Sequence, residues 1–175
     1  MLTLSIFRHA KSSWADPGQA DAERPLNARG RKAAVAMGRY IAGEGLLPGR
    51  ILCSTSVRTR ETVARAFGDI KGAPEPEFVD AIYLAPAERL LDLVRKLPAR
   101  DGRVMIVGHN PGLQDLALGL VAPDANGDLA RLAEKLPTAA LVVITFEAAS
   151  WRAVQPGRGR LERFVTPRDL DGGGA

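Results

Sequence analysis

Two apolar runs in this chain each lead directly to a histidine. Residues 2–7 (Leu-Thr-Leu-Ser-Ile-Phe) precede Arg8 and His9, and residues 104–108 (Val-Met-Ile-Val-Gly) precede His109. Apolar runs of this length, bounded by polar or turn-forming residues, predict buried strands. Because open α/β sheets hold their ligand sites at the carboxyl ends of parallel strands, we expect the two imidazoles to share one site.

The rest of the pattern alternates short strands with amphipathic helices and then becomes rich in strands. Apolar periodicity predicts helices over residues 28–42, 57–67, 86–96, 113–120 and 129–135. Further strands are predicted over residues 50–53, 140–146, 151–155 and 160–165, with an edge strand within 75–83. This order predicts an α/β fold, a three-layer α/β/α sandwich around a mostly parallel mixed sheet.

The composition is that of one globular domain. The chain has 175 residues, of which 46% are hydrophobic and 25% are charged. We expect the domain to span residues 1–168 and the glycine-rich residues 169–175 to form a flexible C-terminal tail. Since the sequence shows no secretion signal and no apolar run near the roughly 18 residues of a membrane span, we expect a cytoplasmic protein without a membrane partner.

An excess of basic residues raises the question of a nucleic-acid partner. The net charge is +4 and the pI is near 9.6. However, no block of five or six basic residues occurs, and aromatic residues make up only 5% of the chain, so platforms for stacking bases are scarce. We therefore expect no nucleic-acid partner. A phosphate- or nucleic-acid-binding module without catalysis is kept as the lowest alternative.

Four side chains at the expected strand ends could carry chemistry. Arg8 and His9 follow the first strand, Arg58 lies just beyond the strand at 50–53, and His109 follows a later strand. A guanidinium donates in a fixed fork that matches phosphate oxygens, and an imidazole can donate to an anion or act as a nucleophile. The four groups together predict a site for a phosphoryl group.

Four motifs, in order, resemble those of the histidine phosphatase superfamily, which is also called phosphoglycerate mutase-like. The first signature is matched by residues 8–14 (Arg-His-Ala-Lys-Ser-Ser-Trp), and the helix-start motif by residues 24–30 (Arg-Pro-Leu-Asn-Ala-Arg-Gly). The motif of the second arginine is matched by residues 54–62, and that of the second histidine by residues 107–111 (Val-Gly-His-Asn-Pro). The resemblance runs from residue 4 to about residue 120 and implies the phosphoglycerate mutase-like fold.

The resemblance also implies roles for individual residues. His9 would attack phosphorus and become phosphohistidine, which water then hydrolyses, while Arg8, Arg58 and His109 would bind the phosphoryl oxygens. No metal or cofactor would be required. His9 must be neutral at the attacking nitrogen, so its other ring nitrogen needs an acceptor, for which we expect a backbone carbonyl.

Three further residues are candidates for substrate binding. Ser12 and Ser54 could donate hydroxyl hydrogen bonds to the phosphoryl group, and Arg24 could bind substrate through its guanidinium. For Arg24, an ion pair with Asp21 or Glu23 is an equally good interpretation.

Two positions depart from the family pattern. Ala10 stands where glycine is usual in the first signature, a replacement that the short SixA-like branch tolerates. The motif of the general acid has no clear match, and Asp80 is the candidate, with Glu77 and Glu88 nearby. An alcohol needs a proton to leave, whereas the imidazole of a phosphohistidine needs it less. A weak acid motif together with a short chain therefore favours a phosphohistidine or another phosphoramidate as the substrate, with phosphohistidine in a protein as the leading expectation.

Two alternatives remain open within the enzyme class. The chain could be a phosphatase or a mutase that acts on a small phosphorylated metabolite, although a mutase needs closing segments for which this chain has little length. The expected partner is therefore a phosphorylated protein or a small phosphorylated substrate. We expect a monomer or a weak homodimer.

Overall fold

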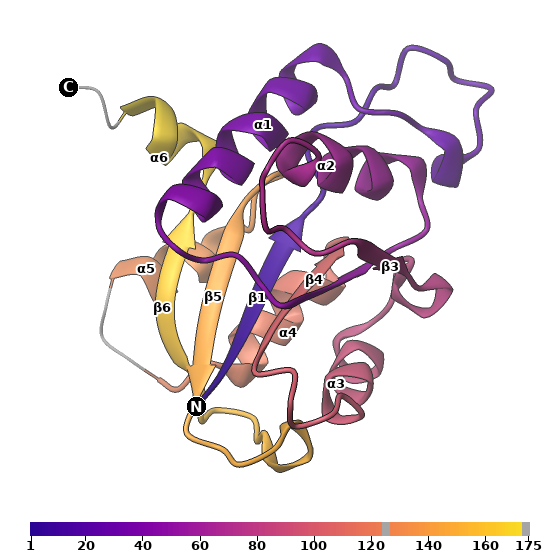
Figure 1. Ribbon diagram of the computed structural model, residues 1–175. Helices are drawn as coiled ribbons and strands as arrows, with labels where there is room; N and C mark the ends of the chain where they lie inside the picture. The colour runs from indigo at the N-terminus through magenta and orange to yellow at the C-terminus, as the bar shows by residue number, and fades with distance from the viewer. Residues whose placement is uncertain (124–126, 173–175) are drawn as a thin grey trace.

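A computed structural model describes residues 1–123 and 127–172 and contains one six-stranded sheet. Its order is β3-β2-β4-β1-β5-β6. The strands are β1 (Leu2–Arg8), β2 (Arg50–Cys53), β3 (Pro76–Phe78), β4 (Arg103–Gly108), β5 (Leu141–Phe146) and β6 (Arg160–Val165). The first four strands are mutually parallel, whereas β5 runs antiparallel to β1 and β6 antiparallel to β5 (Figure 1). The mixed, mostly parallel sheet is as predicted.

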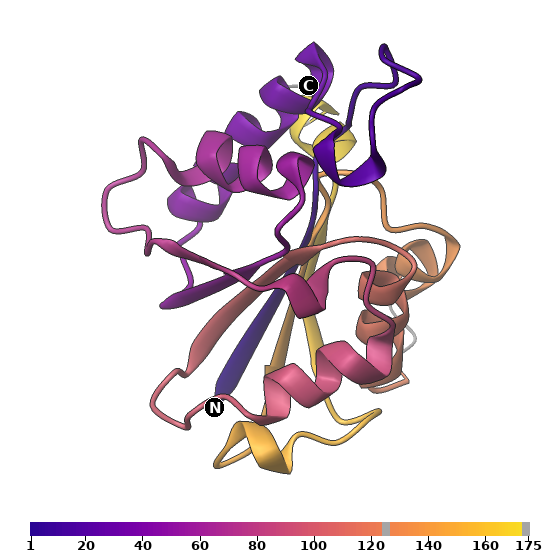
Figure 2. The same ribbon diagram turned by 90° about the vertical axis from the view of Figure 1, so that its right-hand side faces the viewer.

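Helices cover both faces of the sheet, which gives three layers (Figure 2). One layer holds α1 (Ala28–Gly43), α2 (Val57–Phe67) and α6 (Pro167–Gly172). The other holds α3 (Ala87–Arg95), α4 (Gly112–Leu120) and α5 (Gly127–Glu134). The predicted α/β/α sandwich is therefore confirmed. No helix among the described residues is long and apolar enough to span a membrane.

Each face of the sheet packs against its own hydrophobic cluster. On β1, Leu4 and Ile6 belong to one cluster and Phe7 to the other, and all three are fully buried. Side chains of a strand alternate between the two faces, so a central strand covered by helices on both sides is apolar throughout. The run from Leu2 to Phe7 is therefore mostly apolar, interrupted only by the small polar residues Thr3 and Ser5, of which Ser5 is buried.

The register of the central strands brings the two histidines together. Arg8 of β1 is paired with Gly108 of β4, and the backbone N–H of His9 donates to the Gly108 carbonyl at 3.1 Å. His9 and His109 therefore follow neighbouring parallel strands at the same level. The carboxyl ends of both strands point toward the upper edge of the sheet in Figure 1.

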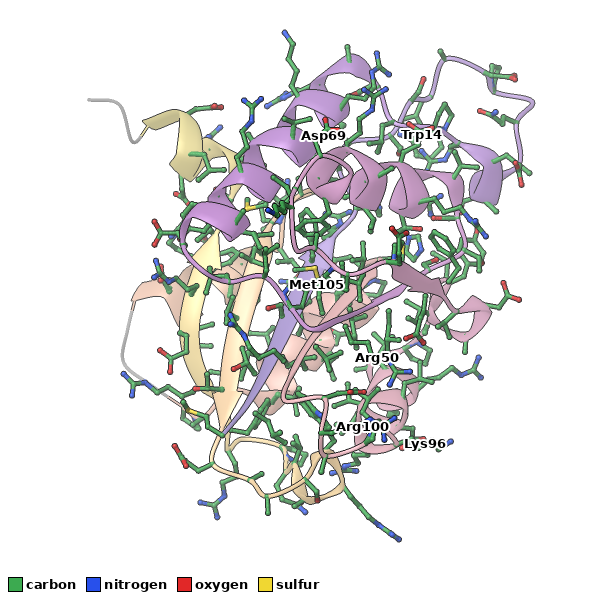
Figure 3. The ribbon with its side chains drawn as sticks, viewed as in Figure 1. Trp14, Arg50, Asp69, Lys96, Arg100 and Met105 are labelled. Atoms are coloured by element: carbon green, nitrogen blue, oxygen red, sulfur yellow. The ribbon has the colours of Figure 1, made fainter. Side chains whose placement is uncertain are left out.

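The loop between β1 and α1 is fixed at its base and projects over this edge (Figure 1). Asn27 caps α1, because its side chain accepts from the Gly30 N–H at 2.8 Å, and its own N–H donates to the Lys11 carbonyl. A Cβ on Gly30 would lie 2.1 Å from the Lys11 oxygen, so only glycine allows the helix to start this close to the loop. The loop contains a short 3₁₀ turn, η1 (Asp21–Glu23). In Figure 3 its Trp14 lies at the opposite end of the molecule from Arg100.

Two sequence predictions need correction, and the predicted edge strand is confirmed in a shorter form. The segment predicted as a strand at 151–155 instead begins with a 3₁₀ turn, η3 (Trp151–Ala153), in which the buried Trp151 donates its indole N–H to the Asp101 carbonyl at 2.6 Å. The edge strand is confirmed only as the three residues of β3, followed by the 3₁₀ turn η2 (Asp80–Ile82).

The C-terminal tail is the second correction. Residues 169–172 belong to α6, because Asp169 accepts from the Thr166 N–H and pairs with Arg131 at 2.8 Å. Residues 173–175 of the predicted flexible tail lie outside the described residues.

Candidate active site

His9 is held in a defined tautomer directly after β1. Its Nδ1 lies 2.7 Å from the carbonyl oxygen of Ala10, which can only accept, so Nδ1 carries the proton and Nε2 keeps a free lone pair. The N–H of Ala10 donates in turn to Thr62 Oγ1 at 2.9 Å. The backbone that orients the ring is therefore itself held in place. The acceptor is the kind of backbone carbonyl that the sequence analysis expected.

His109 lies beside His9 in the opposite tautomer. The centroids of the two rings are 5.4 Å apart. Arg58 Nη2, which can only donate, lies 3.3 Å from His109 Nδ1, so this nitrogen accepts and Nε2–H donates to Ser54 Oγ at 2.7 Å. Ser54 is fully buried and follows β2, so three neighbouring strands each contribute to this cluster.

Burial lowers the pKa of both imidazoles. For His9, burial is the largest cause, and nearby cations add to it, so that the pKa falls to about 4 despite the opposing hydrogen bond to Ala10. For His109, burial and then the charge of Arg58 lower the pKa to about 3. Both rings are therefore neutral near pH 7, which is the state that a nitrogen nucleophile requires.

We expect neither imidazole to titrate between about pH 5 and pH 8 in the ligand-free protein. His9 should gain a proton, and lose its nucleophilic lone pair, only as the pH falls through about 4. Since the chain has only 2 histidines, long-range ¹H–¹⁵N spectra contain two sets of ring signals. We expect the Nδ1–H tautomer for His9 and the Nε2–H tautomer for His109. A titration midpoint near about 6.5 for either ring would contradict this assignment.

Two arginines of the site each keep one buried donor without a partner. Arg58 donates through Nη1 to the Asp21 carbonyl at 2.7 Å and through Nη2 to Asp21 Oδ2 at 3.0 Å, while Arg8 Nη1 donates to the Leu136 carbonyl at 2.9 Å. The Nε atoms of both arginines are buried and have no partner among the described residues. Such a donor costs about 1–3 kcal/mol when unpaired. An anion with several oxygens could satisfy both.

The charges of these arginines also favour the binding of an anion. Burial, and after it the neighbouring charge of Arg58, lowers the pKa of Arg8. Two guanidiniums close enough to repel each other in a buried place are stabilised when a negative group binds between them. Among the described residues, no group of three or more His, Cys, Asp or Glu side chains is placed to hold a metal ion.

One carboxylate, Asp21, joins the arginines at the open side of the site. Its Oδ2 accepts from Arg58 and from the hydroxyl of Tyr83, and its Oδ1 accepts from Arg24 Nη2 at 3.1 Å. The hydrogen bond from Tyr83 is the largest cause that lowers the pKa of Asp21, to about 2, and Arg58 adds to it. Asp21 is therefore ionised at neutral pH and has no proton to give to a leaving group.

The three residues predicted to bind substrate all lie at this edge of the sheet and contact other residues of the site. Ser12 Oγ accepts from Arg24 Nη1, and Ser54 Oγ is bonded to His109. Arg24 is buried and forms the ion pair with Asp21 that the sequence left open. These bonds give Ser12, Ser54 and Arg24 a supporting place around the arginines and histidines.

Asp80, the candidate general acid, is not brought into this cluster. It is the first residue of η2 and is exposed, and its backbone carbonyl accepts from the Tyr83 N–H at 3.0 Å in that turn. Its carboxylate takes part in none of the hydrogen bonds that join the histidines, arginines and Asp21. The carboxylate beside the site is Asp21, and the prediction for Asp80 gains no support.

Tyr83 is a site residue that the sequence analysis missed. Its ring packs edge-on against His109, with centroids 5.3 Å apart, and its hydroxyl donates to Asp21. The only signal in the sequence was its place shortly after a strand that reaches the same edge of the sheet.

Comparison with known proteins agrees with this geometry. A model of the histidine phosphatase superfamily (branch 1) matches residues 4–81. A protein from Mycobacterium tuberculosis, itself without an assigned function, is 32% identical over 165 residues, which cover 93% of this chain and 100% of that protein. The chain belongs to the histidine phosphatase superfamily. Membership in this superfamily implies phosphatase activity, which is a hydrolase activity.

Two solved structures place this histidine phosphatase near the SixA-like branch. SixA from Agrobacterium tumefaciens, assigned as a phosphohistidine phosphatase, is 29% identical with a TM-score of 0.77, over 95% of this chain and 98% of that one. SixA from Nakamurella multipartita, with the same assignment, is 26% identical with a TM-score of 0.82, over 95% and 96% of the two chains. The phosphoglycerate mutase-like fold implied by the sequence motifs is confirmed.

Proposed function

We propose that this histidine phosphatase is metal-independent, acts through a phosphohistidine intermediate on His9, and removes phosphate from phosphohistidine in a protein. In the first step, His9 Nε2 attacks phosphorus, the new N–P bond forms, and the N–P bond of the substrate breaks. In the second step, water attacks the phosphorus of phospho-His9, the N–P bond breaks, and phosphate leaves with one proton passing to solvent. His9 returns to its neutral state.

One observation carries the catalytic part of this proposal. A neutral imidazole with a free Nε2 lies in the same buried cluster as two guanidiniums whose Nε–H groups lack partners. Preorganised donors at the place where negative charge develops are commonly the largest single contribution to catalysis. A phosphoryl group bound by Arg8 and Arg58 would meet the lone pair of His9 and satisfy both buried donors.

The choice of phosphohistidine rests on the absence of a suitable acid among the described residues of the site. Asp21 is ionised, with a pKa of about 2, and both imidazoles are neutral. An alkoxide leaving group would have to depart without a proton, which is slow. A phosphohistidine whose second ring nitrogen carries a proton leaves as neutral imidazole and needs no acid from the enzyme. The SixA assignment of the two structural relatives supports the same substrate.

We expect turnover of a phosphohistidine protein to exceed turnover of phosphorylated metabolites by about 10²-fold or more in kcat/KM. The measurement compares initial rates on a histidine-phosphorylated protein with a panel of sugar phosphates, phosphorylated acids and nucleotides. Phenyl phosphate and p-nitrophenyl phosphate serve as a matched pair, because they differ mainly in the basicity of the leaving oxygen. p-Nitrophenyl phosphate, whose leaving oxygen is less basic, should be cleaved far faster than phenyl phosphate. Equal rates for the pair, or a metabolite preferred to phosphohistidine, would refute the assignment of substrate.

A further inference from the structure

Asp21 has contacts on three sides and is the most accessible charge of the site. Its side chain is 45% exposed, compared with 3% for Arg58 and 8% for Arg24, the two arginines with which it pairs. The ring of Trp14 lies 3.6 Å over the guanidinium of Arg24 and covers it. A molecule that approaches from the open side therefore meets a carboxylate, with the positive charges behind it.

The contacts of Asp21 leave the phosphate-binding donor of Arg58 free. The Asp21 carbonyl and carboxylate occupy Nη1 and Nη2 at the end of the guanidinium, while Nε–H remains unpartnered and buried. Asp21 therefore orients Arg58 without occupying this inner donor. The hydroxyl of Tyr83, the residue that follows η2, donates to the carboxylate and fixes the charge in position.

We propose that Asp21 is a specificity-determining residue, which holds Arg58 ready for the phosphoryl group and rejects substrates that carry a carboxylate close to their phosphate. The inference rests on the proposed function, since it needs the phosphoryl group to bind at Arg8 and Arg58. Phosphorylated sugar acids and phosphorylated amino acids place a second anion a few bonds from phosphorus. That anion would lie beside the fixed charge of Asp21, whereas an imidazole or an aryl group would not.

Binding to the His9→Ala protein tests the inference without any turnover. Titration calorimetry at low salt measures the affinities for phenyl phosphate, which has no carboxylate, and for 3-phosphoglycerate, which has one. We expect the His9→Ala protein to bind phenyl phosphate more tightly than 3-phosphoglycerate. The additional Asp21→Asn change should raise the affinity for 3-phosphoglycerate, relative to that for phenyl phosphate, by about fivefold, because it removes one like charge at a partly solvated site. Asparagine keeps an oxygen that can accept from Arg58.

Glu23→Gln in the same background is the matched control. Glu23 lies two residues further along η1 and has no ion pair among the described residues. If Asp21→Asn left the ratio of the two ligand affinities unchanged, the specificity role of Asp21 would be overturned. If Glu23→Gln changed this ratio as much as Asp21→Asn does, the effect would come from the general surface charge, and the specific role would be overturned as well. If neither ligand bound to either protein, the proposed function itself would fail. Binding of both ligands without an effect of Asp21→Asn would refute only the inference.

Discussion

Replacement of His9 by alanine is expected to abolish the phosphoenzyme and to lower the turnover number by about 10⁴-fold or more, because the only proposed nucleophile is lost. The other residues of the site would still bind the phosphoryl group, so substrate affinity should survive the change. The residual rate would come from binding and charge stabilisation alone, with water as a poorly placed nucleophile.

Phosphoenzyme trapping checks this prediction directly. The protein is incubated with a radiolabelled phosphoryl donor, quenched, and tested for a label that is labile in acid and stable in alkali, as expected for phosphohistidine. The chain holds only 2 histidines, so the matched variant is His109→Ala. We expect this variant to be labelled slowly but still on His9. A label that persists in His9→Ala would move the nucleophile elsewhere and refute the mechanism.

The positions of the two histidines could be predicted from the sequence because they depend on local pattern alone. A mostly apolar run identifies a strand that is buried on both faces, and the residue after the run then lies at the edge of the sheet. The pairing of Arg8 with Gly108 turns two such ends into neighbours. The prediction of this part of the site therefore needs little besides the apolar patterns of β1 and β4.

The carboxylate and the tyrosine of the site could not be predicted in this way. Asp21 lies 37 residues from Arg58 and 62 residues from Tyr83 in the sequence, and none of the three positions has a periodic signal. Their contact depends on how the loop after β1 folds back over the sheet edge, and this follows from tertiary packing such as the approach of Gly30 to Lys11. Position along the chain alone points to Asp80 as the acid instead.

The segment at 151–155 shows the limit of the pattern in another way. The turns on either side of this segment predict a strand there, but in the sheet β6 pairs directly with β5, and the segment between them pairs with neither. Trp151 is instead buried by the turn η3, with its indole N–H donated to the Asp101 carbonyl. Pairing within a sheet is a property of the whole fold and overrides local preference.

Replacement of Arg58 by alanine is expected to lower kcat/KM by about 10²–10³-fold, and lysine should restore little of it. Lysine keeps the charge but lacks the planar fork, so it cannot bond to both the backbone carbonyl and the carboxylate of Asp21 and still present a donor toward phosphate. The matched control is Arg60→Ala on the same helix, where an exposed arginine donates to the Thr55 carbonyl. It should leave kcat/KM within about twofold. Thermal unfolding separates catalysis from folding, because a loss of activity in a variant that stays folded at the assay temperature reports on catalysis alone. A lysine variant with near-normal activity would show that charge alone suffices, and that the free Nε–H of Arg58 has no part in binding phosphate.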